Sequence, residues 1–232
     1  MPRDRKITEA FGRECLHGYL AATSYIDAQV GRLLAALDES GLAKNTIVIL
    51  WGDHGYYMGE HSWWGGKHNN YEGATHTLLL CALPGQKTAG KSTRGIVEYV
   101  DIYPTLVELC GLPQPKDAAQ LEGVSFAPLF VNPDQSWKKA AFSEYPKGGP
   151  SADGVQSQYH GLTMRTERWR YVEWTSKKTG EIAARELYDH ERDPQENENI
   201  FDHADPALFK ELAAQMRDYW KAAKPANQPS SK

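Results

Sequence analysis

The stretch Thr46-Ile-Val-Ile-Leu-Trp51, followed at once by Gly52-Asp-His-Gly55, decides the fold class. The first six residues are apolar or β-branched and do not alternate with polar ones, which predicts a strand buried on both faces of a parallel sheet. Residues 18–37 precede it with apolar side chains at helical spacing, and Ser40-Gly41 ends that helix. A helix leading into a buried parallel strand is half of a βαβ unit, so the α/β class is expected.

The next elements extend this pattern as far as a composition change. Residues 77–83 are a second buried strand, ended by Pro84-Gly85, and residues 95–100 are a candidate short strand. Asp101 is the expected N-cap of a helix that runs to Cys110. From about residue 113 to 133 the chain is rich in Pro, Gly and Asp, so we place a domain boundary near residue 135.

The remaining sequence predicts a small α+β subdomain. Four strands are expected, two of which form a hairpin around Glu167-Arg168, and a helix follows. The strands are placed at residues 140–145, 161–166, 169–174 and 186–189, and the helix at 206–223. The expected organisation is therefore an α/β part over 1–135, a subdomain over 136–224 and a disordered tail over 225–232.

Composition excludes several classes of protein. The chain has 232 residues, 41% of them hydrophobic, which is a globular composition. A net charge of -4 does not favour a nucleic-acid partner. No apolar run is long enough for a transmembrane helix, and the N-terminal residues contain no signal peptide. Cys15, Cys81 and Cys110 form no CxxC pair and are expected to be buried free thiols.

The residues that carry chemistry follow the first strand. Asp53 comes directly after the strand, where open α/β sheets bind their ligands, and its carboxylate can bind a divalent cation. Lys67 can neutralise an anionic oxygen as a compact charge. Each residue alone is also compatible with a turn or a solvated side chain. Together they predict a metal and anion site, which hydrolysis of a sulfate or phosphate ester requires.

The order of these motifs resembles that of the sulfatase family. Residues 19–38 resemble the helix before the second metal motif of sulfatases, and residues 46–61 resemble that motif itself. The resemblance continues through Lys67 and the C-terminal motifs to about residue 203, which is nearly the whole chain. His54 after the aspartate and the pattern Gly59-Glu-His61 are most similar to the iduronate-2-sulfatase group.

This resemblance implies the C-terminal half of an alkaline-phosphatase-like sulfatase domain, followed by the small subdomain. It implies that Asp53 and His54 are metal ligands, with Ca²⁺ the usual ion, and that Lys67 contacts the substrate sulfate. The loop before Lys67 is one residue longer than the family pattern and contains Trp63-Trp-Gly-Gly66. The implied activity is hydrolysis of sulfated sugars or glycosaminoglycans, and full-length members are periplasmic, secreted or lysosomal.

The nucleophile of this family is a formylglycine made from Cys in the context Cys-x-Pro/Ala-x-Arg. None of the three cysteines has these neighbours. We therefore expect a fragment that lacks the nucleophile, is inactive alone and pairs with the missing N-terminal half. A phosphodiesterase or phosphonate hydrolase of the same superfamily is the alternative enzyme, and a non-catalytic remnant or sugar-binding module is the alternative of another class. The upstream sequence distinguishes them.

Overall fold

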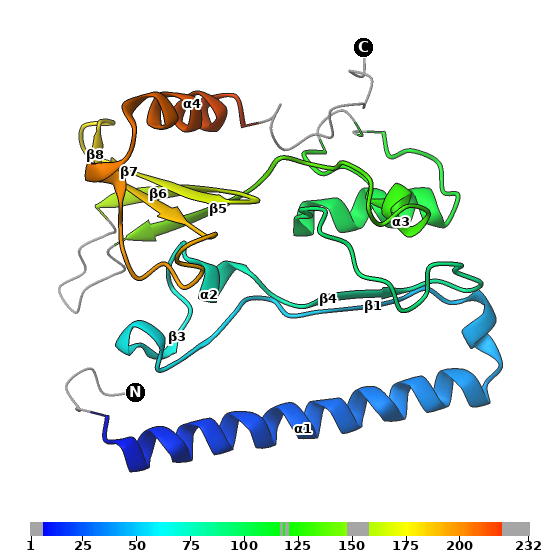
Figure 1. Ribbon diagram of the computed structural model, residues 1–232. Coiled ribbons are helices and arrows are strands. Elements are labelled where there is room, and N and C mark those ends of the chain that lie inside the picture. Colours follow the sequence, from blue (N-terminus) through cyan, green and yellow to red (C-terminus); the bar gives the residue numbers. More distant parts are fainter. Residues whose placement is uncertain (1–6, 117, 119–120, 148–157, 220–232) are drawn as a thin grey trace. The chain divides into compact units, whose positions relative to one another are not determined.

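The computed structural model describes residues 7–116, 118, 121–147 and 158–219 (Figure 1). The packing divides the chain into two compact units, Met1–Gln86 and Lys87–Lys232. The domain boundary near residue 135 stays a prediction, and the expected tail at 225–232 lies outside the described residues. Among the described helices, none combines the length and the apolar character that crossing a bilayer requires.

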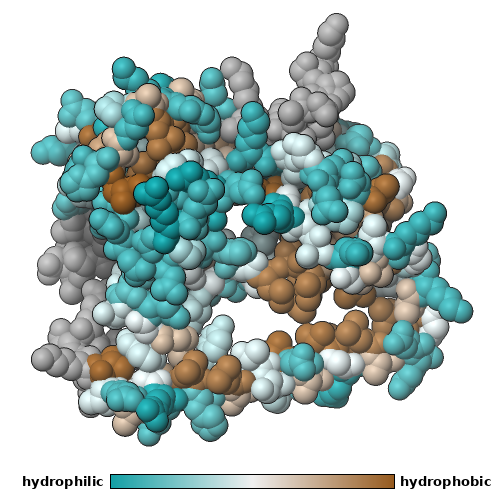
Figure 2. All heavy atoms as spheres, in the orientation of Figure 1, coloured by the Kyte–Doolittle hydropathy of each residue, from teal (hydrophilic) through white to brown (hydrophobic). Residues whose placement is uncertain are grey.

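The first unit begins with the long helix α1, Glu9–Glu39. The side chain of Thr8 accepts a hydrogen bond from the backbone N–H of Phe11 and caps the start, and Gly41 beyond the end has a φ of +72°. Tyr19, Ile26 and Leu33 are among the apolar residues at helical spacing, and they are 44%, 57% and 71% exposed. Apolar atoms recur along α1 at the bottom of Figure 2. Within the described residues this face is therefore largely uncovered.

The strands β1, Val48–Trp51, and β4, Leu79–Ala82, form a two-stranded sheet after the short 3₁₀ helix Leu42–Asn45. Both strands were predicted, but the predicted parallel, fully buried arrangement is wrong. Val48 pairs with Ala82 and Trp51 with Leu79, so the pair is antiparallel. The longest helix in the intervening chain is the one-turn α2, Glu72–Thr75, so the chain lacks the long helical crossover that usually joins parallel strands. Both strands remain partly exposed.

The second unit begins with irregular chain that contains the helix α3, Ile102–Leu109. The 3₁₀ helix Tyr99–Asp101 directly precedes α3, and the 3₁₀ helix Ala127–Phe130 follows it later in the chain. The expected strand at 95–100 is reduced to a single bridge between Ile96 and Lys138.

Asp101 is the N-cap residue of α3, as predicted, but its carboxylate makes no cap hydrogen bond to that helix. It accepts hydrogen bonds from the backbone N–H groups of Glu98 and Val124 instead. Lys138 Nζ lies 2.6 and 2.8 Å from the two carboxylate oxygens of Asp101 and 3.0 Å from Glu98 Oε2. The side chains of Lys138 and Asp101 are completely buried. This buried ion group connects three separate segments, residues 98–101, 124 and 138–142, since Glu98 Oε1 also accepts from the N–H of Phe142.

The predicted α+β subdomain is present. Its sheet has the order β5-β6-β7-β8 and is antiparallel throughout. The strands are Ala140–Lys147, Tyr159–Thr166, Trp169–Ser176 and Ile182–Asp189, followed by the 3₁₀ helix Phe201–His203 and α4, Pro206–Arg217. The helix α4 packs on the sheet through one apolar core, which contains Ala140, Met164, Tyr171, Leu187, Leu212, Ala213 and Met216.

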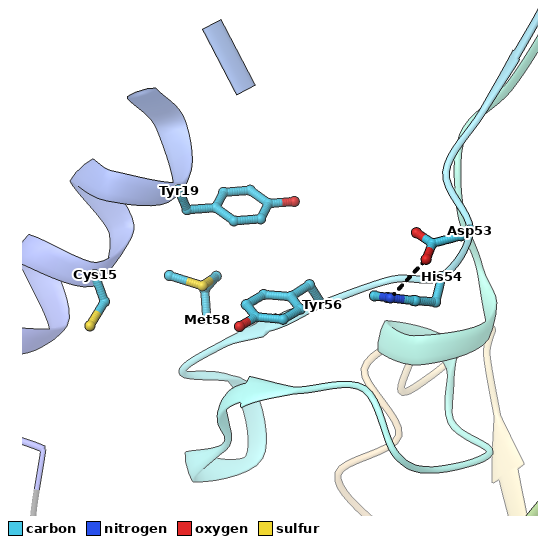
Figure 3. A pocket seen from close by; sticks show the side chains of 6 residues that line it. All are labelled: Cys15, Tyr19, Asp53, His54, Tyr56 and Met58. Atoms are coloured by element: carbon cyan, nitrogen blue, oxygen red, sulfur yellow. Dashed lines mark ion pairs between the residues drawn. The ribbon is translucent and has the colours of Figure 1, made fainter. Parts of the chain in front are cut away.

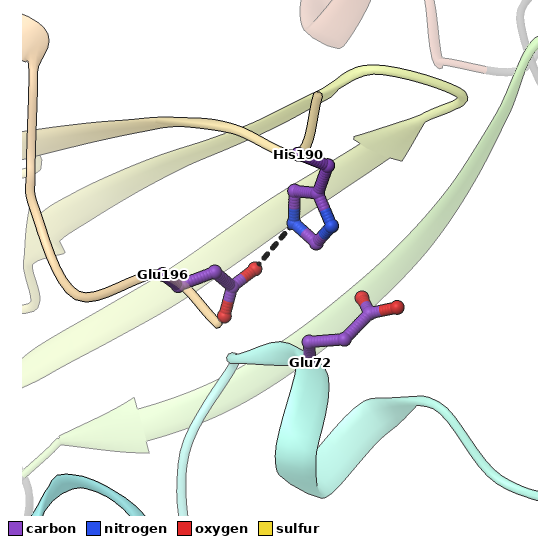
Figure 4. A group of neighbouring side chains, drawn as sticks. All are labelled: Glu72, His190 and Glu196. Carbon is purple, nitrogen blue, oxygen red and sulfur yellow. Dashed lines mark hydrogen bonds and ion pairs between the residues drawn. The ribbon is translucent and has the colours of Figure 1, made fainter. Parts of the chain in front are cut away.

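Ion pairs fix the chain that leaves β8. Arg168 binds both carboxylate oxygens of Asp189, at 2.9 and 2.7 Å, and this hydrogen bonding lowers the pKa of Asp189. Glu196 has a φ of +59°, and its carboxylate accepts from Arg170 and lies 2.8 Å from His190 Nε2 (Figure 4). The side chains of Arg170, His190 and Glu196 are nearly completely buried. The loop after β8 is therefore held by charged hydrogen bonds as well as by packing.

The cysteines differ from the sequence expectation in part. All three are free thiols, as expected. Cys15 and Cys81 are half-buried, and burial raises the pKa of the Cys81 thiol. Cys110 is exposed, so the prediction that all three are buried is wrong. It is the C-cap residue of α3.

Candidate functional site

The turn that carries Asp53 and His54 is fixed on both sides by backbone contacts. Gly52 N donates to Leu78 O at 3.1 Å, and Gly52 O accepts from Thr77 Oγ1 at 2.9 Å. Gly55 N donates to Ala74 O at 2.9 Å, and a Cβ atom at residue 55 would lie only 2.0 Å from the carbonyl oxygen of Gly73. Only glycine permits this close approach. The end of β1 is thereby held against the chain that leads into β4.

Asp53, His54 and Lys67 meet at this strand end. His54 Nε2 lies 3.1 Å from Asp53 Oδ2 and 2.6 Å from Lys67 Nζ. His54 Nδ1 lies 2.7 Å from the carbonyl oxygen of Gly55, which can only accept, so Nδ1 carries the proton. The lone pair of Nε2 then faces the Lys67 ammonium. Every residue predicted for the site is present in this one cluster.

The donor set fits a divalent cation. Nε2 and Oδ2 both offer lone pairs at a separation of 3.1 Å, which suits neighbouring ligands of a cation bound at about 2.3–2.6 Å. Metal-binding histidines usually donate their other N–H to a carbonyl or carboxylate, as His54 does to Gly55. The Asp53 side chain is 83% exposed and accessible.

Two side chains supply only part of such a coordination shell. Within the described residues, no third acidic, histidine or cysteine side chain completes a group with Asp53 and His54. Calcium takes about six to eight oxygen ligands. A cation at this position would therefore need further oxygen ligands from water, substrate or other polypeptide.

Lys67 follows a small hairpin of β2, Tyr57–Met58, and β3, Trp64–Gly66, with the 3₁₀ turn Glu60–Ser62 between them. The ring of Trp64 occupies the space above Gly12 of α1, where a Cβ would lie 2.6 Å from the ring. It also covers Gly59, whose added Cβ would lie 2.9 Å from it. The loop before Lys67 is thus packed onto α1 through Trp64.

A cavity of about 430 Å³ opens beside the cluster (Figure 3). Asp53 and His54 form its polar end. The rest of its lining is aromatic or sulfur-containing, from Cys15 and Tyr19 of α1 and from Tyr56 and Met58 after the strand end. Sequence reasoning missed the two tyrosines, because Tyr19 matches the helical apolar repeat and Tyr56 gives no signal beyond its place two residues after His54.

Comparison with known families identifies the chain. The family described as N-sulphoglucosamine sulphohydrolase, C-terminal, matches residues 59–223, and the family described as Sulfatase matches residues 3–112. Solved structures that share the fold include sulfatases of the alkaline-phosphatase-like α/β type. The chain belongs to the sulfatase family.

Individual relatives agree with this assignment. Iduronate 2-sulfatase of Mus musculus is 30% identical over 255 residues, covering 84% of this chain and 45% of the relative. A protein solved in complex with its substrate D-glucosamine-2-N,6-O-disulfate is 28% identical with a TM-score of 0.75, covering 91% of this chain and 42% of that one. The phosphonate monoester hydrolase of Agrobacterium radiobacter is 27% identical with a TM-score of 0.68, covering 86% and 40%. The chain therefore spans less than half the length of these relatives.

Proposed function

We propose that this chain forms the metal- and sulfate-binding wall of an enzyme that hydrolyses sulfate esters of sugars. The observation that carries the proposal is the cluster of Asp53, His54 and Lys67 at the end of β1. Two relatives support the substrate class. One is named iduronate 2-sulfatase, and the other was solved in complex with a glucosamine disulfate as its substrate.

Asp53 Oδ2 and His54 Nε2 would hold the cation, for which Ca²⁺ is the proposed ion. When bound, a divalent cation supplies positive charge that stabilises the sulfate oxygens as negative charge grows on them. By accepting a hydrogen bond from Nδ1–H, Gly55 O leaves the free lone pair of His54 on Nε2, where the cation would bind.

Lys67 would serve the sulfate itself. Its ammonium lies 2.6 Å from His54 Nε2, and a cation bound to that nitrogen would take the lone pair that this contact uses. The three N–H donors of Lys67 would then be available to non-bridging sulfate oxygens. We infer that this charge is in place before the reaction begins, because Trp64, three residues before Lys67, packs on α1. A preorganised charge at a developing oxyanion stabilises the transition state without reorganisation.

The nucleophile would come from a polypeptide outside these 232 residues. No cysteine here stands in the context Cys-x-Pro/Ala-x-Arg from which the family makes formylglycine. We propose that the complete enzyme, meaning this chain together with the polypeptide that supplies the nucleophile, is the catalytic species. A covalent nucleophile divides one difficult step into two, and the metal and lysine alone cannot replace it.

One observation favours a second candidate function. The phosphonate monoester hydrolase shares the fold at 27% identity, and a metal with a lysine also suits a phosphonate ester. The sulfated-sugar proposal is preferred because both matching families carry sulfatase descriptions.

The complete enzyme is expected to release sulfate from glucosamine 6-sulfate and to act far more slowly on 4-nitrophenyl phenylphosphonate. The measurement is kcat/KM for each substrate. Ion chromatography follows the sulfate released from the sugar, and absorbance follows the nitrophenolate released from the phosphonate. The 232-residue chain alone is the control and should turn over neither. Faster hydrolysis of the phosphonate would favour the second function, and turnover by the chain alone would contradict the missing nucleophile.

A further inference from the structure

Two tyrosines stand beside the metal and sulfate cluster without belonging to the core. Tyr19 of α1 and Tyr56 after the strand end are stacked, with ring centroids 5.9 Å apart and planes within 9° of each other. They are 44% and 43% exposed. Tyr57 and Tyr171, by contrast, are 3% and 0% exposed and serve the interior.

The stacked pair lines the same cavity as Asp53 and His54 (Figure 3). The cavity has a charged end and an apolar end, and its volume of about 430 Å³ lies within the range of roughly 300–1,000 Å³ of small-molecule sites. A ligand that fits it must carry an anionic group at one end and a body with an apolar face at the other. Met58 and Cys15, which complete the lining, are polarizable and adapt to irregular shapes.

We propose that Tyr19 and Tyr56 form a stacking platform for the sugar ring of a sulfated hexose or hexosamine. A pyranose presents a face of C–H groups to the electron-rich face of an aromatic ring, while its hydroxyls remain available to water and the tyrosine hydroxyls. Tyr56 lies two residues after His54, so the platform and the metal ligands share one turn and keep their spacing. The inference rests on the proposed function. It concerns the sugar ring, which is the part of the substrate that the sulfate site does not contact.

The platform predicts that a sulfated sugar binds more tightly than the same anion without the sugar. The test is isothermal titration calorimetry of the 232-residue chain with Ca²⁺ present, using glucosamine 6-sulfate and inorganic sulfate as probes, with saturation-transfer NMR of the bound sugar. Stacking of this kind contributes roughly a three- to tenfold change in affinity for each ring. Tyr19→Ala and Tyr56→Ala should therefore weaken glucosamine 6-sulfate by about that factor and leave inorganic sulfate unchanged. The saturation should fall on the sugar ring protons.

Tyr25→Ala is the matched control, because Tyr25 lies on the same helix, is 66% exposed and does not line the cavity. Tyr56→Phe keeps the ring and should keep the sugar preference, which separates stacking from a hydroxyl contact or a folding defect. Equal weakening of both probes, or no change in the sugar preference, would overturn the platform and leave the sulfate site intact. Absence of binding of either probe to the wild-type chain would contradict the proposed function as well.

Discussion

Replacing Lys138 with alanine is expected to lower the free energy of unfolding by about 3–5 kcal/mol, the usual cost of removing one partner from a buried ion group. The change leaves the buried carboxylate of Asp101 and that of Glu98 without their shared cation. Most domains are stable by only about 5–15 kcal/mol. Chemical denaturation followed by tryptophan fluorescence measures the loss.

The adjacent residue supplies the control for this prediction. Lys139 is exposed, so Lys139→Ala should leave the midpoint close to that of the wild type. The same residue type and the same charge change are thus compared inside and outside the ion group. Equal midpoints for the two variants would show that Lys138 does not connect the segments around Asp101 and Glu98.

Replacing Lys67 with alanine is expected to cost about 2–4 kcal/mol of transition-state stabilisation, the range for losing a positioned charge-stabilising group. That corresponds to roughly a 30- to 1,000-fold lower kcat/KM of the complete enzyme on glucosamine 6-sulfate. Stability should change little, because Lys67 is only half-buried and lies in a polar loop.

Lys44→Ala is the control for the charge change, since Lys44 is an exposed lysine of the same unit, in the 3₁₀ helix after α1. It should retain wild-type kinetics. If Lys67→Ala lowered the melting temperature and left kcat/KM unchanged, Lys67 would be a structural partner of His54 and not a sulfate ligand.

The local elements were predictable because their signals are local. The hairpin of β6 and β7 around Glu167-Arg168 and the apolar face of α4 follow from residue periodicity and turn residues alone. The meeting of Asp53, His54 and Lys67 followed from motif order rather than from spacing. Sequence spacing does not show that a lysine fourteen residues after an aspartate returns to it.

The failed predictions concern partners that lie far away in the sequence. The apolar run of β1 indicated a strand, but its direction relative to β4 depends on the connection, which turns back instead of crossing over. Asp101 has the residue type and position of a cap, yet Lys138 and the N–H of Val124 occupy its oxygens. The packing of Trp64 on Gly12 is equally non-local, because neither residue indicates the other.

Metal analysis of the complete enzyme tests most directly whether Asp53 and His54 hold the cation of a sulfatase. Wild-type, Asp53→Asn and the exposed control Asp38→Asn would be dialysed against the same low-calcium buffer, and their calcium measured by mass spectrometry and compared with kcat/KM. We expect stoichiometric calcium in the wild type and in Asp38→Asn, and a large loss of both calcium and turnover in Asp53→Asn, since the amide removes a ligand charge. Full calcium content and wild-type kcat/KM in Asp53→Asn would contradict the metal site.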